Sequence, residues 1–379
     1  MKYNVDQEKI KFGINLAPSF TDNNLVQSEG PYFQGGIVSA ANLYAPVLPV
    51  YNPNGSFNFG NNNWGYGHTD IINPVATATL LEDRKKQYRL LGDVFLSYEL
   101  IKDLTFKTSV GLDINNFKRD TYSPSTLQIS GQSGTTQAFA RTKSDYVTNL
   151  LFENTLTYKK QFGLNNFNGV IGFSAQKNRT ERSFARATGF PNDLVHTLNA
   201  GTIAQTAESS GSEWSLLSYF SRLEYDYDGK YLFSVAARRD GSSRFATNTK
   251  WGFFPSGSVG WIISKEKFFE NVPIINFLKI RGSYGETGNF DIPNYAPIAL
   301  LTADNYVFGE GDGSVANGLK PENLPNNRLT WEKKSSWNAG LDITLLKNKL
   351  DLDVNIYDET FSSFLFDVPI PAFTGYSSF

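Results

Sequence analysis

Residues 337–357 read WNAGLDITLLKNKLDLDVNIY, and this stretch decides the fold class. Apolar and polar side chains alternate on both sides of the segment 347–349, whose Lys-Asn-Lys sequence favours a turn. A period of two is typical of a β-strand with one apolar and one polar face, because successive side chains point to opposite sides of a strand. The stretch therefore predicts a hairpin of two long β-strands.

The same alternation recurs along most of the chain, in segments rich in Phe, Tyr, Val, Leu and Thr. From Ile10, for example, Phe12, Ile14 and Leu16 alternate with polar or small residues. Such segments predict strands rather than helices. Eleven strands are predicted, at about residues 9–20, 88–100, 104–117, 145–160, 166–177, 214–227, 230–240, 250–263, 277–287, 331–346 and 349–360.

The connections between these segments alternate in length. Short turns are predicted at 101–103, 161–165, 228–229 and 347–349, and long connections at 21–87, 118–144, 178–213 and 288–330, with intermediate lengths at 241–249 and 264–276. Compact soluble domains rarely contain several long structureless loops. Outer-membrane barrels do, because their strands are joined by short periplasmic turns and long extracellular loops. The pattern thus favours an all-β, antiparallel transmembrane barrel.

Aromatic and polar residues occupy the places that such a barrel requires. Tyr and Phe residues flank the short turns, where a barrel has its interfacial girdle. The polar face would line a wet lumen, whereas a β-sandwich would use shorter strands. A soluble β-sandwich or glycan-binding protein remains the alternative at this stage. The aromatic residues in question are Tyr98, Phe106, Tyr158, Phe167, Tyr225, Tyr227 and Tyr231.

Composition excludes most enzyme classes. The 379 residues carry 35 basic and 37 acidic side chains, a net charge of −2 that gives no electrostatic case for nucleic acid or anionic membrane surfaces. With no Cys there is no disulfide, thiolate metal site or thiol nucleophile, and two His residues leave little imidazole chemistry. Residues 1–13 do not resemble a secretory signal, and no apolar run approaches the roughly 18 residues of a membrane-spanning helix.

No local motif predicts a catalytic residue, a metal site or a cofactor. His68 and His196 lack a second His at clamp spacing, and residues 309–314 (GEGDGS) favour a turn over a cation site. Residues 257–260 (GSVG) lie inside a strand pattern and do not form a nucleophile elbow. Asp351 and Asp353 share one face of a strand, as acid/base pairs sometimes do, but lumen lining accounts for them better.

One long connection is a candidate for ligand contact. Residues 58–67 read NFGNNNWGYG, in which Trp64 and Tyr66 could stack on sugar rings and Asn63 could hydrogen-bond through its amide. Asn and Gly enrichment is also typical of any turn-rich loop. We therefore predict Asn63, Trp64 and Tyr66 as substrate-binding residues, with contact to a partner protein or to solvent as the alternatives.

The chain resembles a known family from residue 219 onward. Residues 219–245 (YFSRLEYDYDGKYLFSVAARRDGSSRF) and 251–261 (WGFFPSGSVGW) look like the barrel of SusC/RagA-type TonB-dependent transporters. Residues 278–289 (LKIRGSYGETGN), 329–332 (LTWE) and 338–342 (NAGLD) continue the likeness in the family's order. The earlier half of the chain fits by architecture more than by motif.

The resemblance implies an outer-membrane importer of the Bacteroidetes type that performs no bond chemistry. A SusD-like surface lipoprotein would cap the barrel, a TonB complex would act through a plug domain, and the substrates would be oligosaccharides or peptides. Outer-membrane lipid would surround the barrel. No plug domain, TonB box or signal peptide is recognised here, so residues 1–379 are interpreted as about half of a 22-stranded barrel. Half a barrel exposes two strand edges, and we predict that it does not insert alone. A plain diffusion porin, a soluble adhesin and a surface glycosidase are the alternatives.

Overall fold

The computed structural model describes residues 2–7, 9–26, 36–44, 46–59, 73–127, 137–270, 272–308 and 313–376. Within them, twelve strands form one antiparallel sheet in the order β1-β2-β3-β4-β5-β6-β7-β8-β9-β10-β13-β14. Every neighbour in the sheet is also a neighbour in the sequence except β10 and β13, which flank a separate hairpin. The strands of the sheet are β1 (Lys2–Gln7), β2 (Ile10–Asn24), β3 (Glu82–Ile101), β4 (Leu104–Ser123), β5 (Phe139–Phe162), β6 (Asn165–Thr188), β7 (Ile203–Tyr227), β8 (Tyr231–Ser242), β9 (Trp251–Ile262), β10 (Ile275–Asn289), β13 (Glu332–Leu345) and β14 (Leu350–Ser362).

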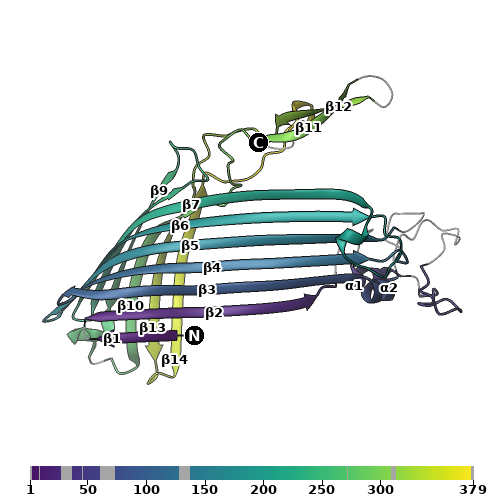
Figure 1. Cartoon of the computed structure of the whole chain (residues 1–379). Helices are drawn as coiled ribbons and strands as arrows, with labels where there is room; N and C mark the ends of the chain where they lie inside the picture. The colour runs from purple at the N-terminus through teal and green to yellow at the C-terminus, as the bar shows by residue number, and fades with distance from the viewer. Residues whose placement is uncertain are drawn as a thin grey trace.

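The sheet is curved and open. Figure 1 shows β2 to β7 as a front wall and β10, β13 and β14 behind it, with the hairpin of β11 (Leu301–Phe308) and β12 (Ser314–Pro321) standing off one rim. β1 and β14 each have one neighbour in the sheet order and are not paired to each other. The described residues therefore form part of a barrel wall. Neither α1 (Ile37–Leu43) nor α2 (Pro74–Leu80), the helices of the described residues, is long and apolar enough to cross a membrane.

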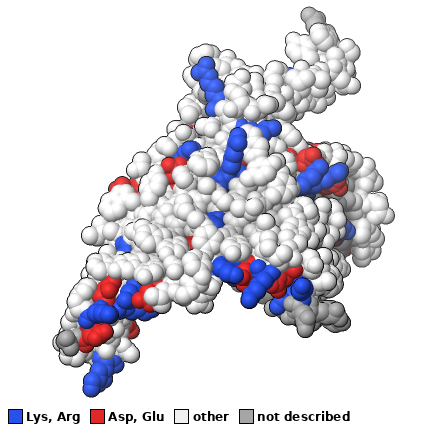
Figure 2. All heavy atoms as spheres, turned by 90° about the vertical axis from the view of Figure 1, so that its left-hand side faces the viewer, with Lys and Arg blue, Asp and Glu red and all other residues white. Residues whose placement is uncertain are grey.

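One end of the sheet carries the short turns. Residues 102–103, 163–164 and 228–230 each connect two long strands. The backbone turns sharply there, with positive φ at Asp103, Gly163 and Gly229. Viewed from this end, charged side chains of both signs lie in small groups on a largely uncharged surface (Figure 2). The opposite end carries the longer connections, which include α1, α2 and the β11–β12 hairpin.

All eleven predicted strands and the four predicted short turns are confirmed, but the long connections predicted at 118–144 and 178–213 are shorter in the structure. The connection predicted at 178–213 spans only 189–202, because β6 and β7 extend to 24 and 25 residues. At about 3.3 Å per residue, 24 residues reach roughly 80 Å, well beyond the ~30 Å of a hydrocarbon core. The ends of the strands that lie outside the hydrocarbon core need no apolar face. The alternation of apolar and polar residues therefore stops there, although the backbone hydrogen bonds between the strands continue. Alternation also gave no indication of β1, β11, β12 or the two short helices.

The outer face of the sheet is apolar and open to its surroundings. On β8, for example, Phe233 and Val235 are 49% and 55% exposed, and Val259 opposite Phe233 is 54% exposed. A soluble sandwich would cover such a face, because a large exposed apolar surface marks contact with a partner or a membrane. The aromatic row beside the short turns is also present: the rings of Tyr158 and Phe167 lie 6.1 Å apart, and those of Tyr227 and Tyr231 6.3 Å.

Two small buried clusters anchor the longer connections to the sheet. One packs Phe245, Phe254, Ile292 and Trp331, whose indole donates a 2.9 Å hydrogen bond to the carbonyl of Lys250. The other packs Tyr122 of β4 against Ala140 of β5 and against Ala138, which immediately precedes β5. The connections at this end are therefore held by packing and do not simply extend into solvent.

Candidate functional site: the polar face of the sheet

The second face of the sheet is lined by polar and charged side chains that bond across neighbouring strands. Arg89 on β3 donates through Nε and Nη2 to the two carboxylate oxygens of Asp113 on β4, at 2.8 and 2.7 Å. Asn15 on β2 donates to Asp93 on β3 at 3.1 Å. Cross-strand pairs of this kind satisfy charges that would otherwise be costly away from bulk water.

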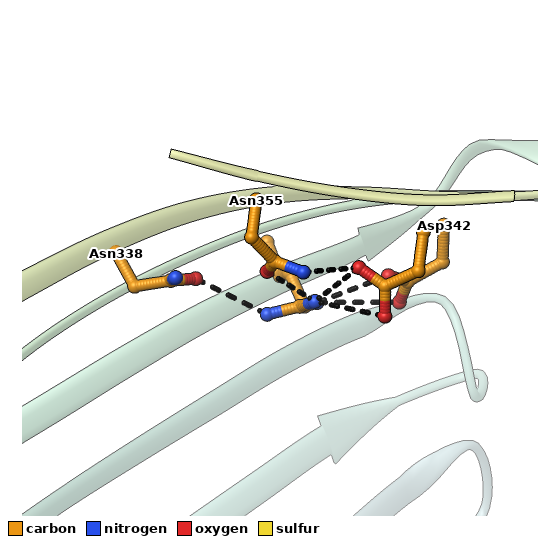
Figure 3. A network of polar contacts seen from close by, with 5 residues as sticks. Asn338, Asp342 and Asn355 are labelled. Atoms are coloured by element: carbon orange, nitrogen blue, oxygen red, sulfur yellow. Dashed lines mark hydrogen bonds and ion pairs between the residues drawn. The ribbon is translucent and has the colours of Figure 1, made fainter. Parts of the chain in front are cut away.

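Arg281 on β10 is the centre of one such network, which joins three strands (Figure 3). Its Nη2 donates to Asn355 at 2.6 Å and to Asp353 at 3.2 Å, both on β14. Its Nε donates to Asp342 at 3.1 Å and its Nη1 to Asn338 at 3.2 Å, both on β13. One guanidinium thus links three strands and neutralises two carboxylates that face each other in register.

A glycine makes room for this guanidinium. Gly340 lies directly opposite Arg281 in the β10–β13 ladder. A Cβ at Gly340 would lie 2.5 Å from Cζ of Arg281 and 2.8 Å from Nε. Real Cβ contacts do not approach this closely, so a side chain at position 340 would displace the guanidinium from its partners.

The network borders a cavity of about 910 Å³. Seven neighbouring strands, β5 to β10 and β13, contribute to its lining, which shows that this face of the sheet is concave. Its walls carry both charge signs: Arg222 pairs with Glu224 at 2.5 Å, and Asn168 donates to Glu224 at 2.7 Å. One lining residue from each of the seven strands is Lys160, Asn168, Arg222, Ser234, Ser258, Arg281 and Asn338.

The arrangement offers many hydrogen-bond donors and acceptors to a polar solute. Among the described residues, no group of three or more His, Cys, Asp or Glu side chains could hold a metal ion. Several charged groups along the cavity are paired: Lys160 with Asp103 at 2.6 Å, Arg222 with Glu224 on the same strand, and Arg281 with Asp342 on the neighbouring strand. A wall of hydrogen-bonding side chains of this kind is typical of the water-filled lumen of a barrel.

A second polar cluster fixes the 189–202 connection to the outer side of the strand ends. Asp193 accepts hydrogen bonds from the hydroxyls of Tyr122 at 2.7 Å and Ser125 at 2.6 Å. The ring of His196 stacks on Tyr122 at 4.0 Å and its Nδ1 lies 3.0 Å from Glu82. The carbonyl of Asp193 and the Glu82 carboxylate raise the pKa of His196 above its usual value. The stacked, ion-paired imidazole thus holds the connection in place.

The residues predicted for ligand contact lie outside this description. Asn63, Trp64, Tyr66 and His68 are not among the described residues, so their role stays a prediction. Residues 309–312 of the predicted turn are also outside it, and residues 257–260 lie within β9 as expected. Asp353 lies on the polar face with Arg281, in agreement with lumen lining.

Sequence reasoning missed the residues that the structure brings together. Arg281, Asn338, Gly340 and Asp342 all occur in the stretches that carry the family resemblance, yet nothing singled them out as one cluster. Their positions on the polar side of two strands are readable from alternation. Which strands are neighbours, and which residues are opposite one another, is set by the register.

Comparison with known proteins identifies the architecture. The family described as "TonB dependent receptor-like, beta-barrel" matches residues 24–378. TonB-dependent receptor P3 of Formosa agariphila is 34% identical over 383 residues, covering 99% of this chain and 37% of that protein. TonB-dependent receptor SusC of Bacteroides thetaiotaomicron is 28% identical over 401 residues, covering 96% and 38%. The solved structure of the RagAB peptide transporter matches with a TM-score of 0.85 and 26% identity, covering 100% of this chain and 41% of that one.

Proposed function

The chain belongs to the TonB-dependent receptor-like β-barrel family, whose members are outer-membrane receptors and not enzymes, and from this premise we propose that it forms part of the wall of an importer. The observation that carries the proposal is the match of the whole chain, at high structural similarity, to a transporter barrel. In this proposal the apolar outer face contacts lipid and the concave polar face lines the path of the solute.

We propose that residues 1–379 are a partial barrel domain and that the remaining strands and a plug domain belong to the same longer protein. The chain spans well under half the length of the relatives that it matches, and its sheet is open. An open edge in hydrocarbon leaves backbone groups without hydrogen-bond partners. The wall described here would therefore function only within a closed barrel.

The proposed solute is an oligosaccharide or a peptide. Both classes present many hydroxyl or amide groups, which match the mixed donors and acceptors along the cavity near Arg222, Glu224 and Arg281. A SusD-like lipoprotein would cover the end with the long connections, and a TonB complex would supply energy through the plug. Asn63, Trp64 and Tyr66 belong to one of these connections and remain candidates for contact with the solute or the lipoprotein.

The test is uptake in the source bacterium. An in-frame deletion of the gene should abolish uptake of one fluorescently labelled oligosaccharide or peptide pool, and a protonophore should abolish the same uptake in the wild type. Uptake that survives the protonophore would contradict energy coupling and favour a diffusion porin. Unchanged uptake of every oligosaccharide and peptide pool in the deletion strain would contradict the proposal as a whole.

A further inference from the structure

Two arginines lie opposite each other on the polar side of the sheet, one near the start of β5 and the other near the end of β6. Figure 1 shows that this end of the sheet carries α1 and α2. Arg141 on β5 and Arg186 on β6 are directly opposite in register. Arg186 lies an even number of residues from Asn168 on the same strand, so it shares the concave face with the cavity. Like charges placed directly opposite are unfavourable in an antiparallel pair, so this arrangement calls for a compensating group.

Asp83, a carboxylate that acts on Arg141, is already bonded to a third arginine. Asp83 on β3 accepts from Nε of Arg119 at 2.7 Å, from its Nη2, and from the hydroxyl of Thr121 at 3.3 Å. The Asp83 residue is only 7% exposed. Its charge is therefore balanced by Arg119 and is not available to neutralise Arg141 and Arg186 as well.

Arg141 and Arg186 have no ion pair within 4 Å among the residues that the structure describes, although the Arg186 guanidinium lies over the Phe139 ring, 4.7 Å from its centroid. Glu208 lies on the same face of β7, diagonal to Arg186, without forming an ion pair within that distance. Arg141 is 21 residues from the turn-side end of β5, about 70 Å along the strand and thus beyond the bilayer. There, burial and the positive charge of Arg119 lower the pKa of Arg141; the Asp83 carboxylate opposes this shift, and Arg186 adds a smaller lowering effect.

Buried donors without partners mark the same place. Nε of Arg186 and Oγ1 of Thr188 are both buried and make no hydrogen bond. Thr188 is 3% exposed and lies two residues from Arg186, on the same face of β6. A buried donor without an acceptor costs about 1–3 kcal/mol, so these two donors, one of them in the Arg186 guanidinium itself, point to a missing acceptor of negative charge.

We propose that Arg141, Arg186 and Thr188, flanked by Arg119, bind an oxyanion group, a carboxylate or a sulfate, on the solute that enters the barrel. The inference rests on the proposed import function and deepens it, since it assigns a negatively charged class of solute. An oxyanion accepts several hydrogen bonds at once and matches the planar donors of arginine. The arginine site lies beyond the bilayer and on the concave face, where a solute that enters the barrel first contacts the wall.

Binding is tested on the full-length protein purified from outer membranes, with glucuronate as the probe. The midpoint of thermal unfolding is measured at increasing concentrations of sodium glucuronate, with sodium chloride at equal ionic strength as the reference. The rise of this midpoint with glucuronate concentration gives an apparent Kd. The wild type should gain stability from glucuronate. Arg141→Gln and Arg186→Gln should weaken the apparent Kd about tenfold or more, the usual effect of losing a hydrogen bond to a charged group.

Arg179→Gln is the matched control, because Arg179 lies on the same strand but on the outer face, paired with Glu181 at 2.5 Å. It should keep the wild-type response. A wild type that gains nothing over chloride, or an Arg179→Gln response as weak as that of Arg186→Gln, would overturn the site. Uptake of a uronate tetramer that is as fast in Arg186→Gln as in the wild type would overturn its role in solute recognition. If the wild-type protein binds glucuronate but supports no uptake of any solute, the binding site stands and only the proposed import function is contradicted.

Discussion

Arg281 and Gly340 lie face to face in the β10–β13 ladder, and the guanidinium occupies the space that a side chain at position 340 would fill. This relationship explains why a glycine stands on the polar side of a strand that otherwise carries Asn338 and Asp342 there. Glycine weakens a strand, so its presence requires a compensating contact. The contact is the network that joins β10, β13 and β14.

Gly340→Ala should therefore destabilise the barrel by about 1–3 kcal/mol, the usual cost of overpacking, because the new methyl group displaces Arg281 from its partners. The measurement is the thermal midpoint of the folded, heat-modifiable form of the full-length protein. Gly257→Ala is the control, since its Cβ would meet only a carbonyl at 3.6 Å. Equal midpoints for the two variants would show that the guanidinium moves aside without cost.

Arg281→Gln should leave Asp342 and Asp353 facing each other without a cation, and so should destabilise the protein by about 1–3 kcal/mol. Adding Asp342→Asn should recover part of that loss, because it removes the repulsion. Unfolding of the two single variants and the double variant gives the coupling energy. Strict additivity of the single effects would contradict the proposed role of Arg281 as the shared counter-ion.

The contact of the 189–202 connection should depend on pH through His196. Because the folded-state pKa is raised, the stabilising effect is fully present below about pH 6.5 and is lost as pH rises through the folded pKa. Hydrogen exchange of residues 189–202 should therefore be slower at about pH 6 than at pH 8, after correction for intrinsic exchange. His196→Gln should show no such difference. The same pH dependence in that variant would assign it to another group.

Trp331→Ala should cost about 3–5 kcal/mol, because the indole is 3% exposed and its removal leaves a cavity beside Phe254 and the Lys250 carbonyl without a donor. Chemical unfolding of the full-length protein measures the cost. Phe268→Ala removes a ring that is 68% exposed and should change stability by less than about 0.5 kcal/mol. A mild effect of Trp331→Ala would show that this cluster does not anchor the connections.

A charge on the outer face should prevent membrane assembly. Val235→Arg places a cation on the apolar face of β8, at a cost of about 2–4 kcal/mol near the bilayer midplane. Ser234, the residue before Val235, lines the cavity, so Ser234→Arg should be tolerated. Heat-modifiable protein in the outer-membrane fraction is the readout. Equal assembly of both variants would contradict the assignment of the two faces.

The sequence alone predicted the strands whose side chains separate cleanly into two faces. The hairpin of 337–357 is an example, because a one-residue slip would exchange its faces and the alternation therefore specifies both strand and register. It did not predict the outer ends of β3 to β7, where no apolar face is needed. The sequence also did not predict β11 and β12. These strands form a small hairpin within a long connection, and their residues do not alternate clearly enough to be distinguished from a loop.

By itself, the sequence determined the fold class, the polar and apolar faces, and the family, because these depend on local periodicity and on motifs within single segments. Only the tertiary structure decided which polar residues meet. Arg281 bonds to residues that lie 57 to 74 positions away, and Arg141 faces Arg186 across two strands joined by a distant turn. Such contacts are set by strand order and register over the whole sheet. Alternation predicts the face on which a side chain lies but not its neighbour across the ladder.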